Sequence, residues 1–429
     1  MKAAVVPKFN FSVKSSKSVW IICQHAGAPR YGMNYRPYNL GRELSAQGID
    51  VTIIGSPFSH QFFARPELHE GNYTIEYIDG MRYCWIRTTD YPKSQSLARV
   101  RAWWDFAWRI LPLSFRAVEL GIPAPDTILV SSPPPYAILP ASRLAKKFKA
   151  RLVFEARDLW PLSLIGLGGH SPWHPFILFT QWVENFAYKN SDGVVSVPPL
   201  AGPHMQEHGL AAKKFHHIPN GVNVERESLE SNEDSSELIH NVLPNRHFIV
   251  GYSGTVGLAN GLSYFVDAAE LLKKNTKIGF AIIGDGADIP YLKTRAREKK
   301  LDNIAFIPAV SKTKIPSILA ELDACFLSLK REKVFEYGVS PTKLFDYLLS
   351  AKPVIMAVES GNDIVGNAGC GIKIDPENPK AIADAVLFLF GLSMEERKAM
   401  GNAGKEFVLK NHDWRNLGEI YAKVLGVDA

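Results

Sequence analysis

Short apolar runs alternate with amphipathic stretches along most of the 429-residue chain. The first apolar run, 18–25, is followed by a helical stretch, 36–48, that places Leu40 and Leu44 on one face. A β-branched run at 50–56 comes next. Strand, helix and strand in this order form a βαβ unit, which predicts a parallel sheet.

The alternation recurs in two series, on either side of a polar, acidic stretch at 224–246. The first series continues through apolar runs at 127–135, 151–160, 191–199 and 215–223, and the second runs from 247 to 358. We therefore predict an α/β fold of two Rossmann-like, doubly wound parallel-sheet domains whose loops face a central cleft. The expected limits are 1–223 for the first domain, 224–246 for the linker, 247–410 for the second domain, and 411–429 for a C-terminal helix that returns to the first domain.

Composition narrows the class of protein. A hydrophobic fraction of 46% and a charged fraction of 21% are those of a globular protein. The net charge of +6 suits anionic partners such as phosphates or a membrane surface and is too small to indicate nucleic-acid binding. The four cysteines are scattered, so we expect neither a disulfide framework nor a zinc site, and a cytoplasmic location. We also expect no signal peptide and no membrane-spanning helix.

The stretch 93–120 mixes aromatic residues with cations. Trp103, Trp104, Phe106, Trp108 and Phe115 share it with five lysine and arginine residues. This mixture suits the headgroup boundary of an anionic membrane. An ordinary helix that packs on the sheet with its cations in solvent explains the pattern equally well.

The segment 339–355, VSPTKLFDYLLSAKPVI, gives the sharpest local signal. We predict Ser340 as the N-cap of a helix and Pro341 as its first residue, followed by Thr342. The free amides of the helix start form an anion site, and Lys343 adds a positive charge. Asp346 lies three residues on and can accept hydrogen bonds from sugar hydroxyls. The alternative is a capped amphipathic helix with a solvated lysine and aspartate.

The segment 251–262, GYSGTVGLANGL, is a second candidate phosphate loop. Gly254 and Gly257 allow close approach of a diphosphate, and Thr255 can donate a hydrogen bond. The segment is not a Walker A loop and lacks the spacing of a dinucleotide site. The similar glycines at 282–286 are more typical of a structural turn.

Two groups of candidates belong to the first domain. Arg157 and Asp158 follow an apolar strand directly, where cleft-lining residues are expected. Gly32, Asn34 and Arg36 belong to a loop after the first strand, which we expect opposite the second domain. No Asp-x-Asp pair occurs in the sequence, so the usual carboxylate clamp for a divalent metal on a diphosphate is missing. We expect no metal and no cofactor.

Five collinear motifs carry a resemblance to a known family: FEARDLWP, HHIPNGVN, GYSGTVG, IIGDG and SPTKLFDYLLSAKPVI. Their order resembles that of family-4 glycosyltransferases of the GT-B fold, in the branch of amino-sugar transferases that assemble bacterial O-antigen and capsular polysaccharide. The resemblance covers nearly the whole chain. It implies a metal-independent retaining enzyme with a nucleotide-sugar donor, often UDP-linked. It assigns 1–223 to the acceptor side and 247–410 to the nucleotide sugar.

The resemblance also implies residue roles, with departures. Asp346 replaces the second Glu of the family's E-x7-E motif, which binds the ribose. The first Glu falls at Gly338, and Glu336 is the candidate substitute. Val310 falls where the family's backbone meets the base, and Arg157–Asp158 replace a His-Asp pair.

The family's phosphate-binding Arg and Lys fall at Thr255 and Asn260. Lys343, Lys330 and Arg331 are the candidates to take over that role.

The predicted function is transfer of a sugar, an N-acetylated amino sugar, from a UDP-sugar to a polyprenyl-linked or soluble saccharide. The expected location is the cytoplasm, at the inner face of the cell membrane. One alternative is a nucleotide-sugar 2-epimerase of the same fold. Another is a non-catalytic membrane-peripheral assembly protein, which the glycine at 338 favours.

Overall fold

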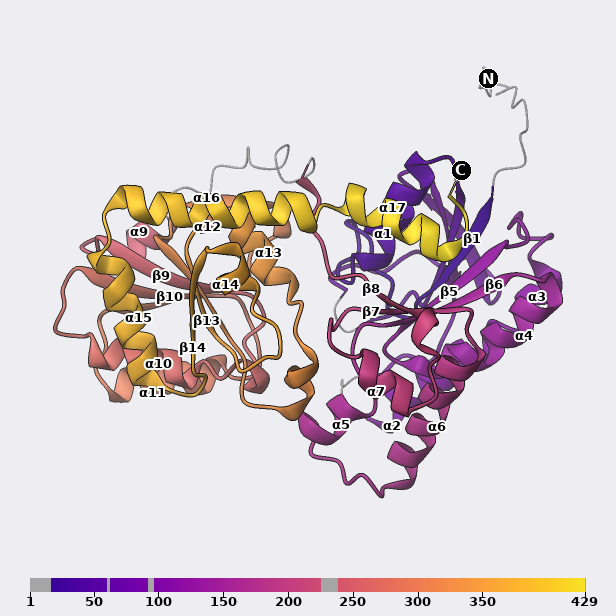
Figure 1. Cartoon of the computed structure of the whole chain (residues 1–429), viewed down its shortest axis with the longest axis horizontal. Helices are drawn as coiled ribbons and strands as arrows, with labels where there is room; N and C mark the ends of the chain where they lie inside the picture. Colours follow the sequence, from indigo (N-terminus) through magenta and orange to yellow (C-terminus); the bar gives the residue numbers. More distant parts are fainter. Residues whose placement is uncertain (1–16, 60–61, 92–95, 225–237, 429) are drawn as a thin grey trace, which may run out of the picture. The chain divides into compact units, whose positions relative to one another are not determined.

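The computed structural model describes residues 17–59, 62–91, 96–224 and 238–428 (Figure 1). Residues 92–95 of the aromatic stretch and 225–237 of the predicted linker therefore lie outside the described residues. The contacts divide the chain into two compact units, Met1–Phe154 with Asn190–Asp192 and Tyr421–Ala429, and Glu155–Lys189 with Gly193–Ile420. The strands form two separate sheets.

The first sheet has eight strands in the order β3-β4-β2-β1-β5-β6-β7-β8. Their bounds are β1 Ser18–Ile22, β2 Asp50–Gly55, β3 Tyr73–Ile78, β4 Met81–Ile86, β5 Thr127–Ser132, β6 Arg151–Ala156, β7 Gly193–Ser196 and β8 Phe215–His217. Strands β4, β2, β1 and β5 pair in parallel, and so do β7 and β8. The parallel sheet predicted for this half of the chain is confirmed.

The edge strand β3 departs from the predicted pattern because it runs antiparallel to β4. Asp79 and Gly80 join the two strands, with φ angles of 47° and 80°. Positive φ at both central residues is the geometry of a tight hairpin turn that matches the twist of the flanking strands. No hairpin was predicted for this part of the chain.

The helices that belong to the first sheet are mostly short. They are α1 Arg36–Ala46, α2 Leu97–Arg109, α3 Leu113–Arg116, α4 Ile138–Phe148, α5 Leu162–Gly166, α6 Pro175–Asn190 and α7 Gly202–Glu207, with 3-10 turns η1 Pro135–Ala137 and η2 Ala212–Lys214. Helix α1 confirms the helical stretch expected at 36–48, and it buries Leu40 and Leu44 as the pattern predicted.

The second sheet has six parallel strands in the order β11-β10-β9-β12-β13-β14. Their bounds are β9 Phe248–Ser253, β10 Ile278–Ile283, β11 Ile304–Ile307, β12 Ala324–Ser328, β13 Val354–Ala357 and β14 Gly371–Ile374. Counted along the chain this is the order 3-2-1-4-5-6, which reverses direction between β9 and β12. Ligands of doubly wound sheets bind at such a switch point, beyond the carboxyl ends of the strands.

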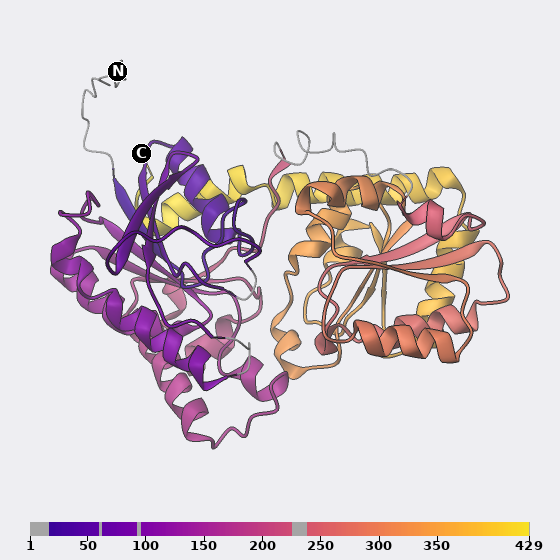
Figure 2. The same ribbon diagram turned by 180° about the vertical axis from the view of Figure 1, so that it is seen from behind.

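Helices cover both faces of the second sheet (Figures 1 and 2). Helices α10 Ser263–Leu271, α11 Ile289–Glu298 and α15 Pro379–Gly391 contribute to the core on one face. Helices α9 Leu238–Val242, α12 Ile315–Ala320, α13 Thr342–Leu349, α14 Ile364–Ala368 and α16 Met394–Asn411 contribute to the other. The 3-10 turns are η3 Leu258–Asn260, η4 Lys312–Lys314 and η5 Lys333–Tyr337.

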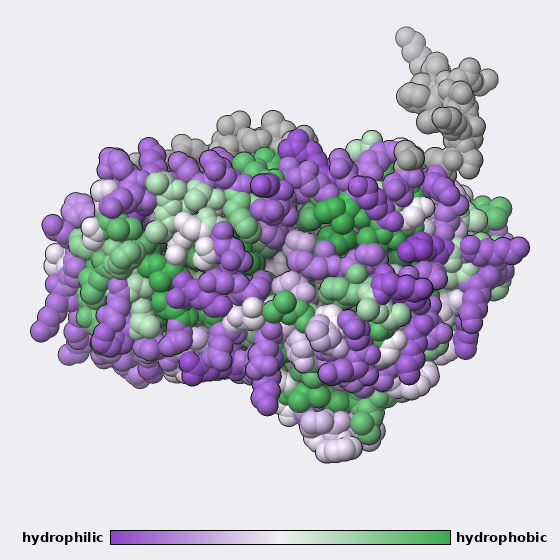
Figure 3. All heavy atoms as spheres, viewed as in Figure 1, coloured by the Kyte–Doolittle hydropathy of each residue, from purple (hydrophilic) through white to green (hydrophobic). Residues whose placement is uncertain are grey.

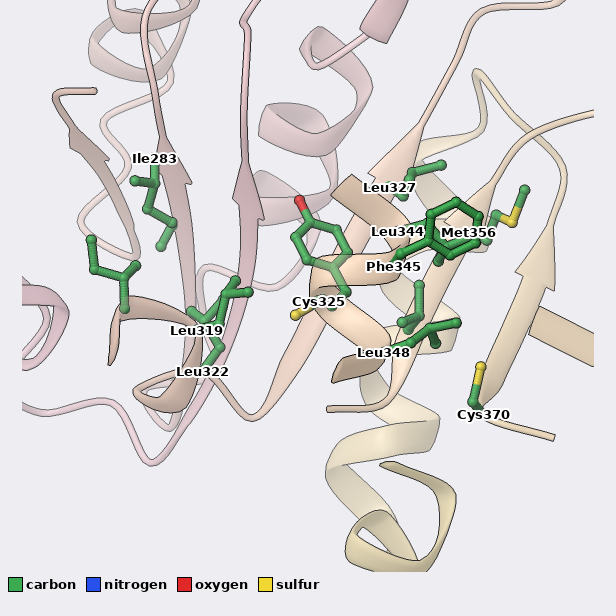
Figure 4. Packing of buried hydrophobic residues seen from close by; sticks show 14 of the residues in the cluster. Ile283, Leu319, Leu322, Cys325, Leu327, Leu344, Phe345, Leu348, Met356 and Cys370 are labelled. Atoms are coloured by element: carbon green, nitrogen blue, oxygen red, sulfur yellow. The ribbon is translucent and has the colours of Figure 1, made fainter. Parts of the chain in front are cut away.

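Helix α13 is anchored by its buried apolar face. Leu344, Phe345, Tyr347 and Leu348 enter the core beside residues of β12 and β13 (Figure 4). Burying side chains of this size contributes about 1.5–3 kcal/mol each. The helix start is therefore held at a fixed place against the sheet.

The last helix, α17 Trp414–Leu425, ends against the first sheet. Thr127 donates its hydroxyl to the carbonyl of Leu425 over 2.9 Å, and Arg151 donates to the carbonyl of Val424 over 3.0 Å. Helix α16 before it begins with a capping box between Ser393 and Glu396.

On the face drawn in Figure 3, hydrophilic areas alternate with separate hydrophobic patches. Among the described residues, no helix combines the length and the apolar character needed to cross a bilayer.

Candidate functional site

The glycine loop after β9 and the start of α13 meet at the switch point of the second sheet. Gly254 has φ +143°, and a Cβ built there would lie 3.1 Å from both Cε and Nζ of Lys343. A side chain at position 254 would therefore occupy the space of the lysine head group. The two segments that the sequence proposed separately as phosphate sites are brought together.

Lys343 is held by two side chains of the same loop region. Its ammonium donates to the Tyr252 hydroxyl over 2.5 Å and to Asn260 Oδ1 over 3.3 Å. The same Nζ lies 4.3 Å from the centroid of the Tyr252 ring, within the range of a cation–π contact. Burial lowers the pKa of Lys343 to about 8, and the charge of Asp346 opposes that shift. A negatively charged neighbour would therefore stabilise the protonated form of Lys343.

Tyrosine hydroxyls fix the loop that faces Lys343. Tyr252 donates to the carbonyl of Thr255 over 2.5 Å, so one hydroxyl joins the lysine to the loop. Tyr347 of α13 accepts from the amide of Ser253 over 2.8 Å and donates to its carbonyl over 2.9 Å. Asn260 Nδ2 donates to the same Thr255 carbonyl over 3.1 Å. These contacts hold the loop and α13 in one arrangement.

The remaining glycines divide into two kinds. A Cβ at Gly284 would lie 2.0 Å from the carbonyl oxygen of Gly254, and one at Gly286 would lie 2.0 Å from that of Val256. The loop at 282–286 therefore packs against the loop at 254–257. This agrees with the prediction that its glycines belong to a structural turn. A Cβ at Gly257 would meet nothing within 4 Å, so open space adjoins that residue. Thr255 beside it is exposed.

The predicted cap of α13 is wrong by one residue. Pro341, with φ −72° and ψ 125°, is the N-cap, and Thr342 is the first helical residue. Ser340 does not cap the helix, because its hydroxyl accepts from the backbone amide of Asn220 over 3.0 Å. Since proline carries no side-chain acceptor, no side chain caps the helix. The amide of Leu344 donates to the carbonyl of Pro341 over 3.0 Å, whereas the amides of Thr342 and Lys343 precede the first intrahelical acceptor.

Asp346 lies one turn further along α13 and forms an ion pair. Its Oδ1 lies 2.7 Å from Nζ of Lys312 in η4. Val310, two residues before Lys312, is half-buried and packs against the core cluster that contains Leu344. The two residues proposed for the nucleoside, Val310 and Asp346, thus belong to adjoining parts of the second sheet's carboxyl edge.

The candidates after β12 have separate surroundings. Lys330 donates its backbone amide to the carbonyl of Ala259 over 2.9 Å, which places it beside the glycine loop. Arg331 pairs with Glu359 over 2.7 Å on the surface. Glu336 is exposed on η5. Gly338 has φ +92°, which a glutamate would adopt only with strain, so the local backbone suits the glycine present.

The first-sheet candidates follow strand ends, as expected. Arg157 is half-buried and Asp158 exposed, directly after β6. Gly32 has φ +126° in the loop after β1, and the Asn34 carbonyl accepts from the amide of Gly27. Arg36 is only 5% exposed and donates to the Tyr421 hydroxyl over 2.6 Å. Arg36 therefore contacts α17, a neighbour that the sequence did not indicate.

Sequence reasoning missed three side chains of the site: Tyr252, Tyr347 and Lys312. Tyr252 lies in the segment 251–262 proposed as a phosphate loop and Tyr347 in the predicted helix after Pro341, but neither side chain was given a role. No local pattern marks Lys312. Among the described residues, no group of three or more His, Cys, Asp or Glu side chains could hold a metal ion.

Two family models match the chain. Residues 31–221 match the model described as "Glycosyl transferase 4-like domain", and residues 236–407 match "Glycosyl transferases group 1". The chain is 25% identical over 380 residues to a protein of Escherichia coli strain K12 named as a colanic acid biosynthesis glycosyl transferase, WcaI. That match covers 83% of this chain and 90% of the relative.

Solved structures share the fold. Sucrose-phosphate synthase from Thermosynechococcus elongatus superimposes with a TM-score of 0.71 at 16% identity, over 96% of this chain and 99% of that one. Anabaena HepE in complex with UDP and glucose gives a TM-score of 0.67 at 13% identity, over 96% and 99%.

Proposed function

Because the chain belongs to the family-4 glycosyltransferases of the GT-B fold, we propose that it transfers an N-acetylated amino sugar from a UDP-sugar to a saccharide. The proposed acceptor is polyprenyl-linked, and the product belongs to a surface polysaccharide. The similarity to WcaI, a protein named for colanic acid biosynthesis, supports this role. The complex of HepE with UDP supports a uridine nucleotide as the donor's leaving group.

One observation carries the proposal: the ammonium of Lys343 lies against Gly254 at the switch point, beside the uncapped start of α13. A diphosphate in that place would accept hydrogen bonds from the first amides of α13 and from Lys343. Its negative charge would also favour the protonated lysine, which burial disfavours in the free protein.

The proposed chemistry is transfer with retention of the anomeric configuration. The acceptor oxygen forms a bond to the anomeric carbon on the face from which the diphosphate leaves. The acceptor's proton passes to the departing diphosphate oxygen, so UDP and the glycoside are the products. Lys343 and the helix start stabilise the charge that develops on the leaving group, a role that requires no metal.

The other candidates have supporting roles in this proposal. Asp346 would accept hydrogen bonds from the ribose with the oxygen atom that Lys312 leaves available. Val310 would meet the base through its backbone. Gly254, Thr255 and Gly257 would adjoin the diphosphate, and Lys330, which lies beside their loop, would add charge.

The acceptor side of the proposal rests on the first sheet. Arg157 and Asp158 would position the acceptor, and Gly32 and Asn34 are further candidates for contact with it. Arg36 would act through packing, because it is buried against Tyr421. Glu336, exposed on η5, would contact the donor sugar in place of the family's first Glu.

A lipid-linked acceptor would place the protein at the inner face of the cell membrane. The test is transfer of labelled sugar from UDP-N-acetylglucosamine, and from UDP-linked 6-deoxy-amino sugars, to a polyprenyl-linked saccharide, with the product analysed by mass spectrometry. A glycosylated lipid with retained configuration supports the proposal. A free sugar epimer formed without acceptor would instead identify a 2-epimerase. Donor binding without any turnover would identify a non-catalytic assembly protein.

A further inference from the structure

Three exposed apolar residues of the stretch 93–120 lie between the end of α2 and the residues after α3, and Leu97, at the start of α2, is exposed separately. Trp108, at the end of α2, is 47% exposed, Phe115 in α3 is 67% exposed, and Val118 after α3 is 87% exposed. Water thus reaches about half of Trp108 and most of Phe115 and Val118. We call these three residues, with the cations described next, the docking face.

The other aromatic residues of the stretch are not available to a partner. Trp103 and Phe106 are buried, and Trp104 stacks on Tyr136 with ring centroids 5.0 Å apart. Most of α2 is therefore an ordinary helix that packs against its own domain. Only the part around Trp108, Phe115 and Val118 matches the aromatic membrane surface that the sequence suggested.

Helix α4, which lies outside that stretch, supplies the cations. The guanidinium of Arg143 lies 5.7 Å from the Trp108 ring, and Nζ of Lys147 lies 5.3 Å from the Phe115 ring. Both cations, and also Lys146 and Lys149, are exposed. Residues 138–151 contain five lysine and arginine residues and no aspartate or glutamate.

We propose that the docking face binds the surface of an anionic lipid bilayer. Its rings and its cations lie side by side, and this is the arrangement that the boundary between lipid headgroups and acyl chains favours. Cations near an anionic headgroup layer attract it, and their contribution falls with salt. The partner and its location rest on the proposed function, since a polyprenyl-linked acceptor lies in a membrane.

The binding is peripheral and reversible. Three apolar side chains reach only the headgroup boundary, and their contribution adds to that of the cations. An uncharged bilayer therefore binds the protein much more weakly than an anionic one, and added salt releases it. A polyacidic protein partner would also respond to salt, but it would give no reason for three exposed apolar residues beside the cations.

The experiment uses the full-length protein in flotation with two kinds of vesicle, phosphatidylcholine alone and an equal mixture with phosphatidylglycerol. We expect binding to the anionic vesicles and its loss in high salt. The double variant Arg143→Glu/Lys147→Glu is expected to lower the partition coefficient more than tenfold. So is Phe115→Ser/Val118→Ser, which keeps the charge and removes apolar contact.

A second pair of substitutions and a matched control separate loss of charge from loss of folding. Arg116→Glu/Lys146→Glu changes exposed cations for which no ring contact is described, and it is expected to weaken binding even if the first double variant folds poorly. Lys293→Glu/Arg297→Glu makes the same charge change on exposed positions of α11 and is expected to bind as the unaltered protein does. Circular dichroism and thermal unfolding confirm that each variant is folded.

Three changes or losses of vesicle binding would overturn the docking proposal. One is absence of binding of the unaltered protein to anionic vesicles at low salt. Another is equal loss of binding in the α11 control. The third is loss of binding only when the exposed Trp173 and Trp182 are replaced by alanine, which would assign the contact to α6 and the loop before it.

Different measurements test the docking proposal and the proposed function, so one can be wrong while the other holds. UDP binding and transfer to a detergent-solubilised acceptor are expected to be unchanged in the docking-face variants. If transfer activity is absent while vesicle binding depends on these residues, the proposed function is wrong and the docking face remains. A change from dimer to monomer in these variants, without a change in vesicle binding, would show that the face joins two copies of the chain and would overturn the docking proposal.

Discussion

The ammonium of Lys343 donates a hydrogen bond to the hydroxyl of Tyr252 and lies 4.3 Å from the centroid of the same ring. The two residues are 91 positions apart in the sequence and meet at the switch point of the second sheet. The tyrosine therefore holds a partly desolvated cation in the place where a diphosphate is expected.

Replacing Lys343 by alanine is expected to weaken UDP binding roughly tenfold, or about 1.4 kcal/mol. The substitution removes a cation from the proposed diphosphate site and leaves the buried face of α13 intact. Isothermal titration calorimetry measures the effect. Lys293→Ala, on the exposed side of α11, is the matched control and should bind UDP normally. Equal affinity of the Lys343 variant and the control would show that the diphosphate binds elsewhere.

The affinity for UDP is expected to fall as the pH rises above about 8. Burial lowers the pKa of Lys343 to about 8, so the free protein loses the ammonium in that range. Binding measured between pH 7 and 9 tests this expectation. The variant Lys343→Arg keeps its charge throughout and retains every other titrating group of protein and ligand. A parallel decline in both proteins would assign the pH dependence to another group.

The lowered pKa of Lys343 makes the free energy of unfolding change with pH in the opposite direction to the UDP affinity. Because the folded-state pKa lies below the unfolded value of 10.5, the unfolded chain binds more protons between pH 8 and 10.5. Through Lys343, the ligand-free protein therefore gains stability with rising pH in this window, while its UDP affinity falls.

Replacing Tyr252 by phenylalanine is expected to lower both stability and UDP affinity. The change removes one of the two acceptors of the Lys343 ammonium, Asn260 being the other, and leaves the Thr255 carbonyl without its hydroxyl donor. A lost hydrogen bond of this kind costs about 1 kcal/mol. Chemical denaturation and calorimetry measure the two effects. Tyr291→Phe is the control: this residue is exposed and its hydroxyl accepts only a long hydrogen bond, 3.3 Å, from Arg295, so its removal should change both quantities much less. Unaltered stability and affinity in the Tyr252 variant would mean that the hydroxyl does not position the lysine.

A lysine at position 260 is expected to compensate for the loss of Lys343. Asn260 Oδ1 lies 3.3 Å from the Lys343 ammonium, so a lysine there could place its own ammonium in the vacated space. We expect Lys343→Ala/Asn260→Lys to bind UDP at least roughly threefold more tightly than Lys343→Ala alone. Lys343→Ala/Asn260→Met, similar in length and uncharged, should show no recovery. Recovery of UDP affinity with methionine would show that side-chain packing, and not positive charge, restores binding.

Patterns within short segments predicted much of the second domain. The alternation of apolar runs and helices predicted its parallel sheet, and SPTKLFDYLL predicted a helix that begins near 341 and buries Leu344, Phe345 and Leu348. These features follow from local periodicity and turn chemistry. The cap was misplaced because Ser340 has a partner distant in sequence, Asn220, which local pattern does not reveal.

The contacts of the site could not be predicted, because they join distant segments. The pairs Lys343–Tyr252 and Asp346–Lys312 exist only once the sheet has placed α13 beside the loops after β9 and β11. The hairpin of β3 and β4 is a different case. Its Asp79–Gly80 turn is a recognised local signal for a hairpin, so this antiparallel pair could have been predicted from the sequence.

The most direct test of the central claim is a crystal structure of the protein with UDP. We predict that the diphosphate oxygens lie within hydrogen-bond distance of Lys343 Nζ and of the first backbone amides of α13, next to Gly254. Density for UDP at another place, with the start of α13 unoccupied, would contradict the account of how this protein binds its donor.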